Sequence, residues 1–147
     1  FIILMIVLVG LLFCLSVYTL FDGIVHYRER AKTLVGLVML YLELMFFYAT
    51  IYFVLNFSAT PYFKGLGQVD LAHYAEVSWA YLFHVGAIYL NALHLSIVTG
   101  TTLGYGDMVP THVFSRLLVD SQVLLSLGLA VAGFGVFFAN LNRTEPE

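Results

Sequence analysis

Two adjacent threonines and two alternating glycines form the segment of this sequence best suited to binding an ion. It reads Thr101-Thr102-Leu103-Gly104-Tyr105-Gly106-Asp107 and lies between two apolar runs. Main-chain carbonyl oxygens can replace the water around a cation when several of them point at one axis. Such a backbone takes alternate residues out of the usual φ/ψ regions, and glycine goes there without a Cβ clash. The pattern therefore predicts a loop whose carbonyls bind a dehydrated cation.

A known pattern continues through Asp107-Met108-Val109-Pro110 to Arg116, at the head of the last apolar run. These residues resemble the selectivity-filter signature of the tetrameric potassium channel family. The resemblance implies passive conduction of K⁺ through a pore, with K⁺ as the only bound group and no catalytic residues. It also implies a homotetramer with three identical subunits as partners. The chain has room for one such loop, and four are needed around a fourfold axis.

The resemblance assigns a role to each residue of the loop. The residues whose oxygens would bind K⁺ are Thr102, Leu103, Gly104 and Tyr105. The residues that would support this site are Thr101, Gly106 and Asp107. Leu103 stands where the family more often has Val or Ile. Because its side chain would point away from the pore, we expect the packing behind the loop to adapt to it.

His94 is a further candidate for support of the loop. It lies thirteen residues before Asp107, where many relatives have a tryptophan that bonds this aspartate. We expect His94 to bond Asp107 and brace the loop, and an ionised aspartate would favour the protonated imidazole. A histidine bonded to a neighbouring carbonyl or to water explains the residue equally well.

The composition places the chain in a bilayer. Its residues are 61% hydrophobic and 10% charged, with a mean hydropathy of +0.94, far from the values of a soluble domain. The net charge of −3 provides no basic patch for nucleic acid. Cys14 is the only cysteine, so no disulfide can form within the chain. We predict a multi-pass protein of the cell membrane that is not an enzyme.

Four apolar runs, at roughly 1–21, 33–57, 78–99 and 116–140, approach the ~20 residues that cross a membrane. The loop must lie inside the membrane with both ends returning to one side, so we divide the third run near Gly86. The prediction is an all-α membrane protein with a pore domain at 33–147. Its parts are an outer helix 33–57, a turret and cap 58–86, a re-entrant pore helix 87–100, a filter 101–107 and an inner helix 113–140.

Residues 1–32 would form an additional N-terminal transmembrane helix and a cytoplasmic link. The link carries Arg28, Arg30 and Lys32, which places it inside by the positive-inside rule. The turret and loop then face outward. Run 1–21 contains no Arg or Lys, whereas a voltage-sensing helix needs several. We therefore expect a lipid-facing helix that packs on the outer helix.

Glu43 lies about ten residues into the second run, where an ionised carboxylate costs at least about 2.5 kcal/mol. The sequence indicates no cation at the same depth. One interpretation is a proton-linked site that couples the outer helix to the gate. The other is a protonated glutamate bonded to a nearby backbone or hydroxyl group.

The inner helix would line the pore cavity and carry the gate. Ser126 occupies the place where the family often has a hinge glycine, and Gly128 follows two residues later as an alternative hinge. Gln122 lies in the outer half, where a polar side chain must face protein or water.

Three alternatives stay open. Gly104-Tyr105-Gly106-Asp107 also matches the Gly-x-Gly-Asp element of intramembrane aspartyl proteases, but that chemistry needs a second aspartate inside an earlier span. The loop could also belong to a poorly selective cation channel or to a non-conducting subunit.

Because the chain starts without Met and stops abruptly at Glu147, we expect further segments, and a cytoplasmic regulatory domain is one candidate.

Overall fold

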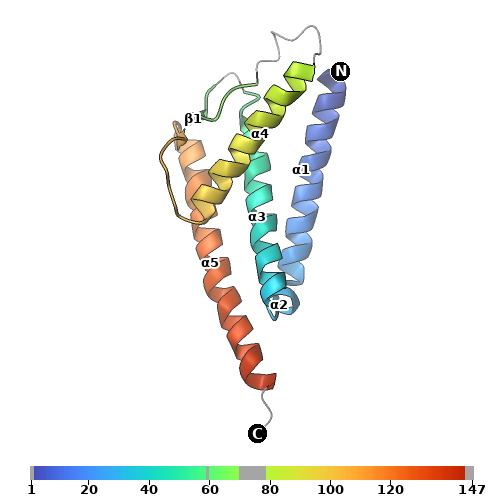
Figure 1. Ribbon diagram of the computed structural model, residues 1–147, viewed down its shortest axis with the longest axis vertical. Coiled ribbons are helices and arrows are strands. Elements are labelled where there is room, and N and C mark those ends of the chain that lie inside the picture. Colours follow the sequence, from blue (N-terminus) through green and yellow to red (C-terminus); the bar gives the residue numbers. More distant parts are fainter. Residues whose placement is uncertain (1, 59, 70–78, 145–147) are drawn as a thin grey trace.

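The computed structural model describes residues 2–58, 60–69 and 79–144 of the chain. This part is an all-α membrane protein with two very short strands (Figure 1). The helices are α1 Ile2–Val25, α2 Tyr27–Arg30, α3 Leu34–Leu55, α4 Trp79–Gly100 and α5 Val113–Thr144. The strands are β1 Phe63–Lys64 and β2 Val109–Pro110, which pair antiparallel.

Three helices of the described part, α3, α4 and α5, are long and apolar enough to cross a membrane. The apolar stretch Val9–Val25 of α1, within the described residues, is shorter. The start of α3 is fixed locally, because the hydroxyl of Thr33 accepts a hydrogen bond from the backbone N–H of Gly36 at 3.1 Å. The α1–α3 link and the end of α5 lie at one end of the molecule (Figure 1), as the predicted topology requires.

Helix α4 is re-entrant despite its length. Figure 1 shows α4 slanting across α3 and ending beside α5, well short of the end where α2 lies. The chain then turns back through the loop to β2, which leads into α5. The segment that consists of α4 and the loop therefore begins and ends toward the same end of the molecule, as predicted.

The predicted break near Gly86 was wrong, because α4 is continuous from Trp79. A glycine inside a helix costs only about 1 kcal/mol relative to alanine, too little to end an apolar helix that packs along α3. Residues 79–86 of the predicted cap thus belong to the pore helix, and 70–78 lie outside the described residues. The inner helix also runs on to Thr144.

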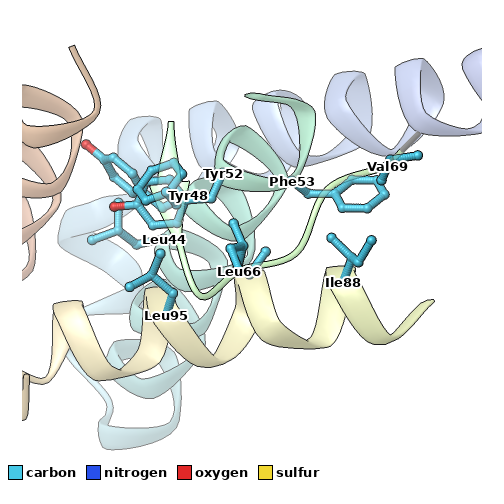
Figure 2. Packing of buried hydrophobic residues seen from close by; sticks show 10 residues of the cluster. Leu44, Tyr48, Tyr52, Phe53, Leu66, Val69, Ile88 and Leu95 are labelled. Atoms are coloured by element: carbon cyan, nitrogen blue, oxygen red, sulfur yellow. The ribbon is translucent and has the colours of Figure 1, made fainter. Parts of the chain in front are cut away.

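The core lies between α3, the turret and α4. Leu66 of the turret is fully buried between Tyr52 of α3 and Leu95 of α4 (Figure 2). The ring of Tyr52 also packs edge-on against Phe63 of β1, with 5.0 Å between ring centroids. The turret is therefore held to the pore helix by apolar burial, which fixes the position of β1 beside the loop.

Candidate functional site

The loop backbone alternates in the way the glycines predict. Gly104 and Gly106 have φ values of 56° and 78°, and Thr102, two residues earlier, has a φ of 60°. A β-branched residue at positive φ is strained, at a cost of order 1–3 kcal/mol, and such strain is concentrated at functional sites. The sequence did not predict this strain at Thr102.

Hydrogen bonds to the last turn of α4 hold the inner end of the loop. The N–H groups of Leu103 and Gly104 both donate to the carbonyl of Val98, at 2.9 and 3.5 Å. In a trans peptide the N–H and the preceding C=O point in opposite directions. The carbonyls of Thr102 and Leu103 therefore face away from α4, on the side where an ion could reach them.

The turret holds the outer end of the loop. Strand β1 pairs with β2, and the N–H of Thr111 donates to the carbonyl of Tyr62 at 3.0 Å. The hydroxyl of Ser115, in the first turn of α5, donates to the same carbonyl at 2.8 Å. One turret carbonyl thus ties the segment after the loop to the start of the inner helix.

Gly65 makes the closest approach of the turret to the loop. A Cβ atom on Gly65 would collide with the carbonyl oxygen of Asp107, and its φ of +87° already disfavours other residues. The contact with Asp107 could not be inferred from the sequence, because it joins segments that are distant in the chain.

The predicted brace, His94, lies beside Asp107. The distance from His94 Nε2 to Asp107 Oδ2 is 3.8 Å, which suits an ion pair but is too long for a hydrogen bond. The imidazole instead stacks on Tyr105, with 5.9 Å between ring centroids and an angle of 11° between the planes. The expected hydrogen bond is absent, because stacking on Tyr105 sets the plane of the imidazole. His94 touches a loop side chain and a supporting carboxylate.

A fully buried polar network links the pore helix to both flanking helices. Tyr52 of α3 donates to Gln122 Oε1 at 2.6 Å, and Gln122 Nε2 donates to the carbonyl and the hydroxyl of Ser96, both at 2.8 Å. Ser96 in turn donates to the carbonyl of Met45 at 2.7 Å. Gln122 faces protein, one of the two surroundings that the sequence left open, and its partners could not be identified from sequence spacing.

The end of α4 contacts both flanking helices. Tyr41 of α3 donates to the carbonyl of Gly100 at 2.5 Å. Ser126 of α5 is fully buried, and its Oγ would lie 3.1 Å from a Cβ atom at Gly100. Gly128 has open space around it, and α5 runs through both positions without a break. A hinge at Ser126 or Gly128 stays a prediction.

Glu43 has a cationic partner, so the inference that none shares its depth was wrong. Arg30 Nη1 lies 2.7 Å from Glu43 Oε1, and Arg30 Nη2 binds Asp22 on α1. The hydrogen bond that Arg30 donates to Glu43 is the main cause that raises the pKa of Arg30. Arg30 belongs to the link, but its long side chain extends along the helices toward Glu43, which spacing along one helix cannot reveal.

Residues 71–143 match the model of a family described as ion channel. We refer to these matched residues as the ion-channel segment. This segment covers α4, the loop and nearly all of α5, and its family is not enzymatic, which removes the aspartyl protease alternative. Neither the curated proteins nor the solved structures gave a significant match.

We expect Gly65→Ala to destabilise the channel, because the methyl group would push against the carbonyl of Asp107 and a left-handed backbone costs about 1–2 kcal/mol for a residue other than glycine. Gly86→Ala is the matched control: its site is open and helical, so alanine should stabilise α4 by up to about 1 kcal/mol. Thermal unfolding of the purified protein should give midpoint shifts of opposite sign. Equal midpoint shifts in the two variants would contradict the contact between Gly65 and the Asp107 carbonyl.

We expect Gln122→Leu to lower the free energy of unfolding by about 1–3 kcal/mol, because it leaves the buried Tyr52 hydroxyl without its acceptor. Adding Tyr52→Phe should recover part of the loss, since both polar partners are then absent. The exposed Gln68→Leu is the control for the change in chemistry. Denaturant unfolding measures all three. If the double variant loses as much unfolding free energy as Gln122→Leu and Tyr52→Phe lose together as single variants, the two residues are not coupled.

Proposed function

We propose that this chain is one subunit of a homotetrameric potassium channel of the cell membrane. The observation that carries the proposal is the alternation of positive φ at Thr102, Gly104 and Gly106 inside the ion-channel segment. Four such loops around one axis would present rings of carbonyl oxygens to a dehydrated K⁺. The oxygens would come from Thr102, Leu103, Gly104 and Tyr105, with the Thr102 hydroxyl at the inner end.

The chemistry that we propose depends on holding these oxygens in place. A K⁺ ion gives up its hydration shell without a large barrier only if the replacing oxygens are already positioned. The inner end of the loop is bonded to Val98, and the outer end is bonded to Tyr62 through Thr111. In our proposal Thr101, Gly106, Asp107 and His94 support the loop between these two attachments.

The exposed face of α5 supports assembly into an oligomer. Leu117, Leu124, Val131 and Phe138 recur every seven residues, and each is more than half exposed in the single chain. Side chains seven apart lie on one face of a helix. In a tetramer this stripe would pack against the inner helix of a neighbouring subunit. The gate would lie farther along α5, with Ser126 or Gly128 as the point of bending.

Helix α1 stands apart from the pore in this proposal. It packs against α3 on the side away from α5, where it adds a lipid-facing helix to the outside of each subunit (Figure 1). The link with Arg28, Arg30 and Lys32 and the end of α5 would face the cytoplasm. A cytoplasmic regulatory domain could then follow α5 directly.

Ion flux into liposomes tests the proposal. The reconstituted protein should pass K⁺ and exclude Na⁺, because its carbonyl rings replace the hydration shell of the larger ion. Gly104→Ala should abolish K⁺ flux, since φ is +56° there and a Cβ atom would distort the ring. Gly10→Ala on α1, with open space around it, should conduct like the parent protein.

Two outcomes would overturn the proposal. Equal K⁺ and Na⁺ flux would make the protein a poorly selective cation channel and would point to Leu103 as the cause. An assembled tetramer that passes neither ion, with or without Gly104→Ala, would make the chain a non-conducting subunit.

A further inference from the structure

A mainly apolar cavity with a few polar side chains lies between α1, α3 and α4, outside the ion-channel segment except for one residue. Its volume is about 270 Å³, near the lower end of the ~300–1,000 Å³ that small-molecule sites span. The apolar lining comes from Leu12, Leu15, Phe46 and Tyr89, and the polar lining comes from Ser16, Thr19, Glu43 and Thr50. The lining includes the carboxylate of Glu43, and an ionisable group among membrane helices is costly and marks a functional site by default.

The polar lining consists mainly of acceptors. Thr19 donates its hydroxyl hydrogen to the carbonyl of Ser16 at 3.1 Å, and Thr50 donates to that of Phe46 at 2.8 Å. Their oxygens keep free lone pairs. Ser16 is more than nine-tenths buried, and among the described residues its Oγ has no hydrogen-bond partner. The cavity therefore suits a ligand that donates hydrogen bonds.

The charges beside the cavity also favour a cation. Asp22 and Glu43 both bind Arg30, so two carboxylates share one guanidinium and the group carries a net charge of −1 when all three are ionised. His26 Nδ1 lies 3.0 Å from Asp22 Oδ1, whereas Arg30 contacts Oδ2, and the imidazole of His26 is mostly exposed. The buried Oε2 of Glu43 is unpartnered among the described residues and packs against Gly23.

We propose that this cavity binds a small alkylammonium ion, with its ammonium group at Glu43 and Ser16 and its alkyl chain along Leu12, Leu15 and Phe46. Glu43 Oε1 would accept from the ligand on the lone pair that Arg30 leaves free. A double-chain lipid is too large for the cavity, whereas a single short chain fits. Since α1 and α3 lie outside residues 71–143, the proposal does not depend on the K⁺ site.

Calorimetric titration of the full chain in phosphatidylcholine nanodiscs tests this site. Octylammonium should bind saturably, after subtraction of its partition into empty nanodiscs. Octanol and octanoate, with the same chain, should bind about tenfold more weakly or not at all, because they lack the charge-assisted hydrogen bond. Equal binding of all three probes, or octylammonium heats no larger than those of empty nanodiscs, would overturn the proposal.

Variants locate the binding. Glu43→Gln should weaken octylammonium about tenfold, whereas Glu29→Gln, the same change at an exposed residue paired with Lys32, should leave its affinity unchanged. Ser16→Leu fills the cavity and removes one of the two groups that would bind the ammonium, but leaves Asp22, Arg30 and Glu43 unchanged, so it should abolish binding even if Glu43→Gln folds poorly. Parent-like octylammonium affinity in Ser16→Leu would place the ligand elsewhere and overturn the proposal.

Discussion

The side-chain amide of Gln122 is the contact on which the arrangement of the three central helices depends. It accepts from α3 and donates to α4 while belonging to α5, and none of these groups reaches solvent. A buried amide without hydrogen-bond partners destabilises the fold by more free energy than a surface contact contributes. The three helices therefore pack in the arrangement in which all hydrogen bonds of Gln122 form. The end of α4 is thereby placed, and with it the start of the loop. The turret then fixes the other end through β1 and Tyr62.

This arrangement explains how a strained loop persists. Positive φ at Thr102 is unfavourable on its own, but the N–H groups that follow it are bonded to Val98 and cannot rearrange without leaving that carbonyl. The strain is balanced by packing between α3, α4 and α5 rather than by contacts within the loop. The fully buried Leu66 contributes to this packing, because it holds the turret against both α3 and α4.

Local chemistry in the sequence was enough to predict the glycine conformations and the re-entrant course of the chain, but for Gln122 it left protein and water open as the surroundings of the side chain. The errors concern features that local sequence does not encode. Gly86 indicated a break between two segments, yet α4 continues through this residue because the helix packs along α3. Glu43 appears isolated when counted along its own helix, yet Arg30 reaches it from the link. The contact of Gly65 with Asp107 depends on how turret and loop meet, which no spacing in the sequence indicates.

The central claim is that residues 102–105 from four chains bind dehydrated ions on one axis, and crystallography with Tl⁺ in place of K⁺ tests it most directly. The account predicts anomalous density on a fourfold axis at the level of the Thr102–Tyr105 carbonyls, with no water between ion and oxygen. Chains that assemble without a fourfold axis, or a fourfold assembly whose axis holds no Tl⁺ at this level, would contradict it.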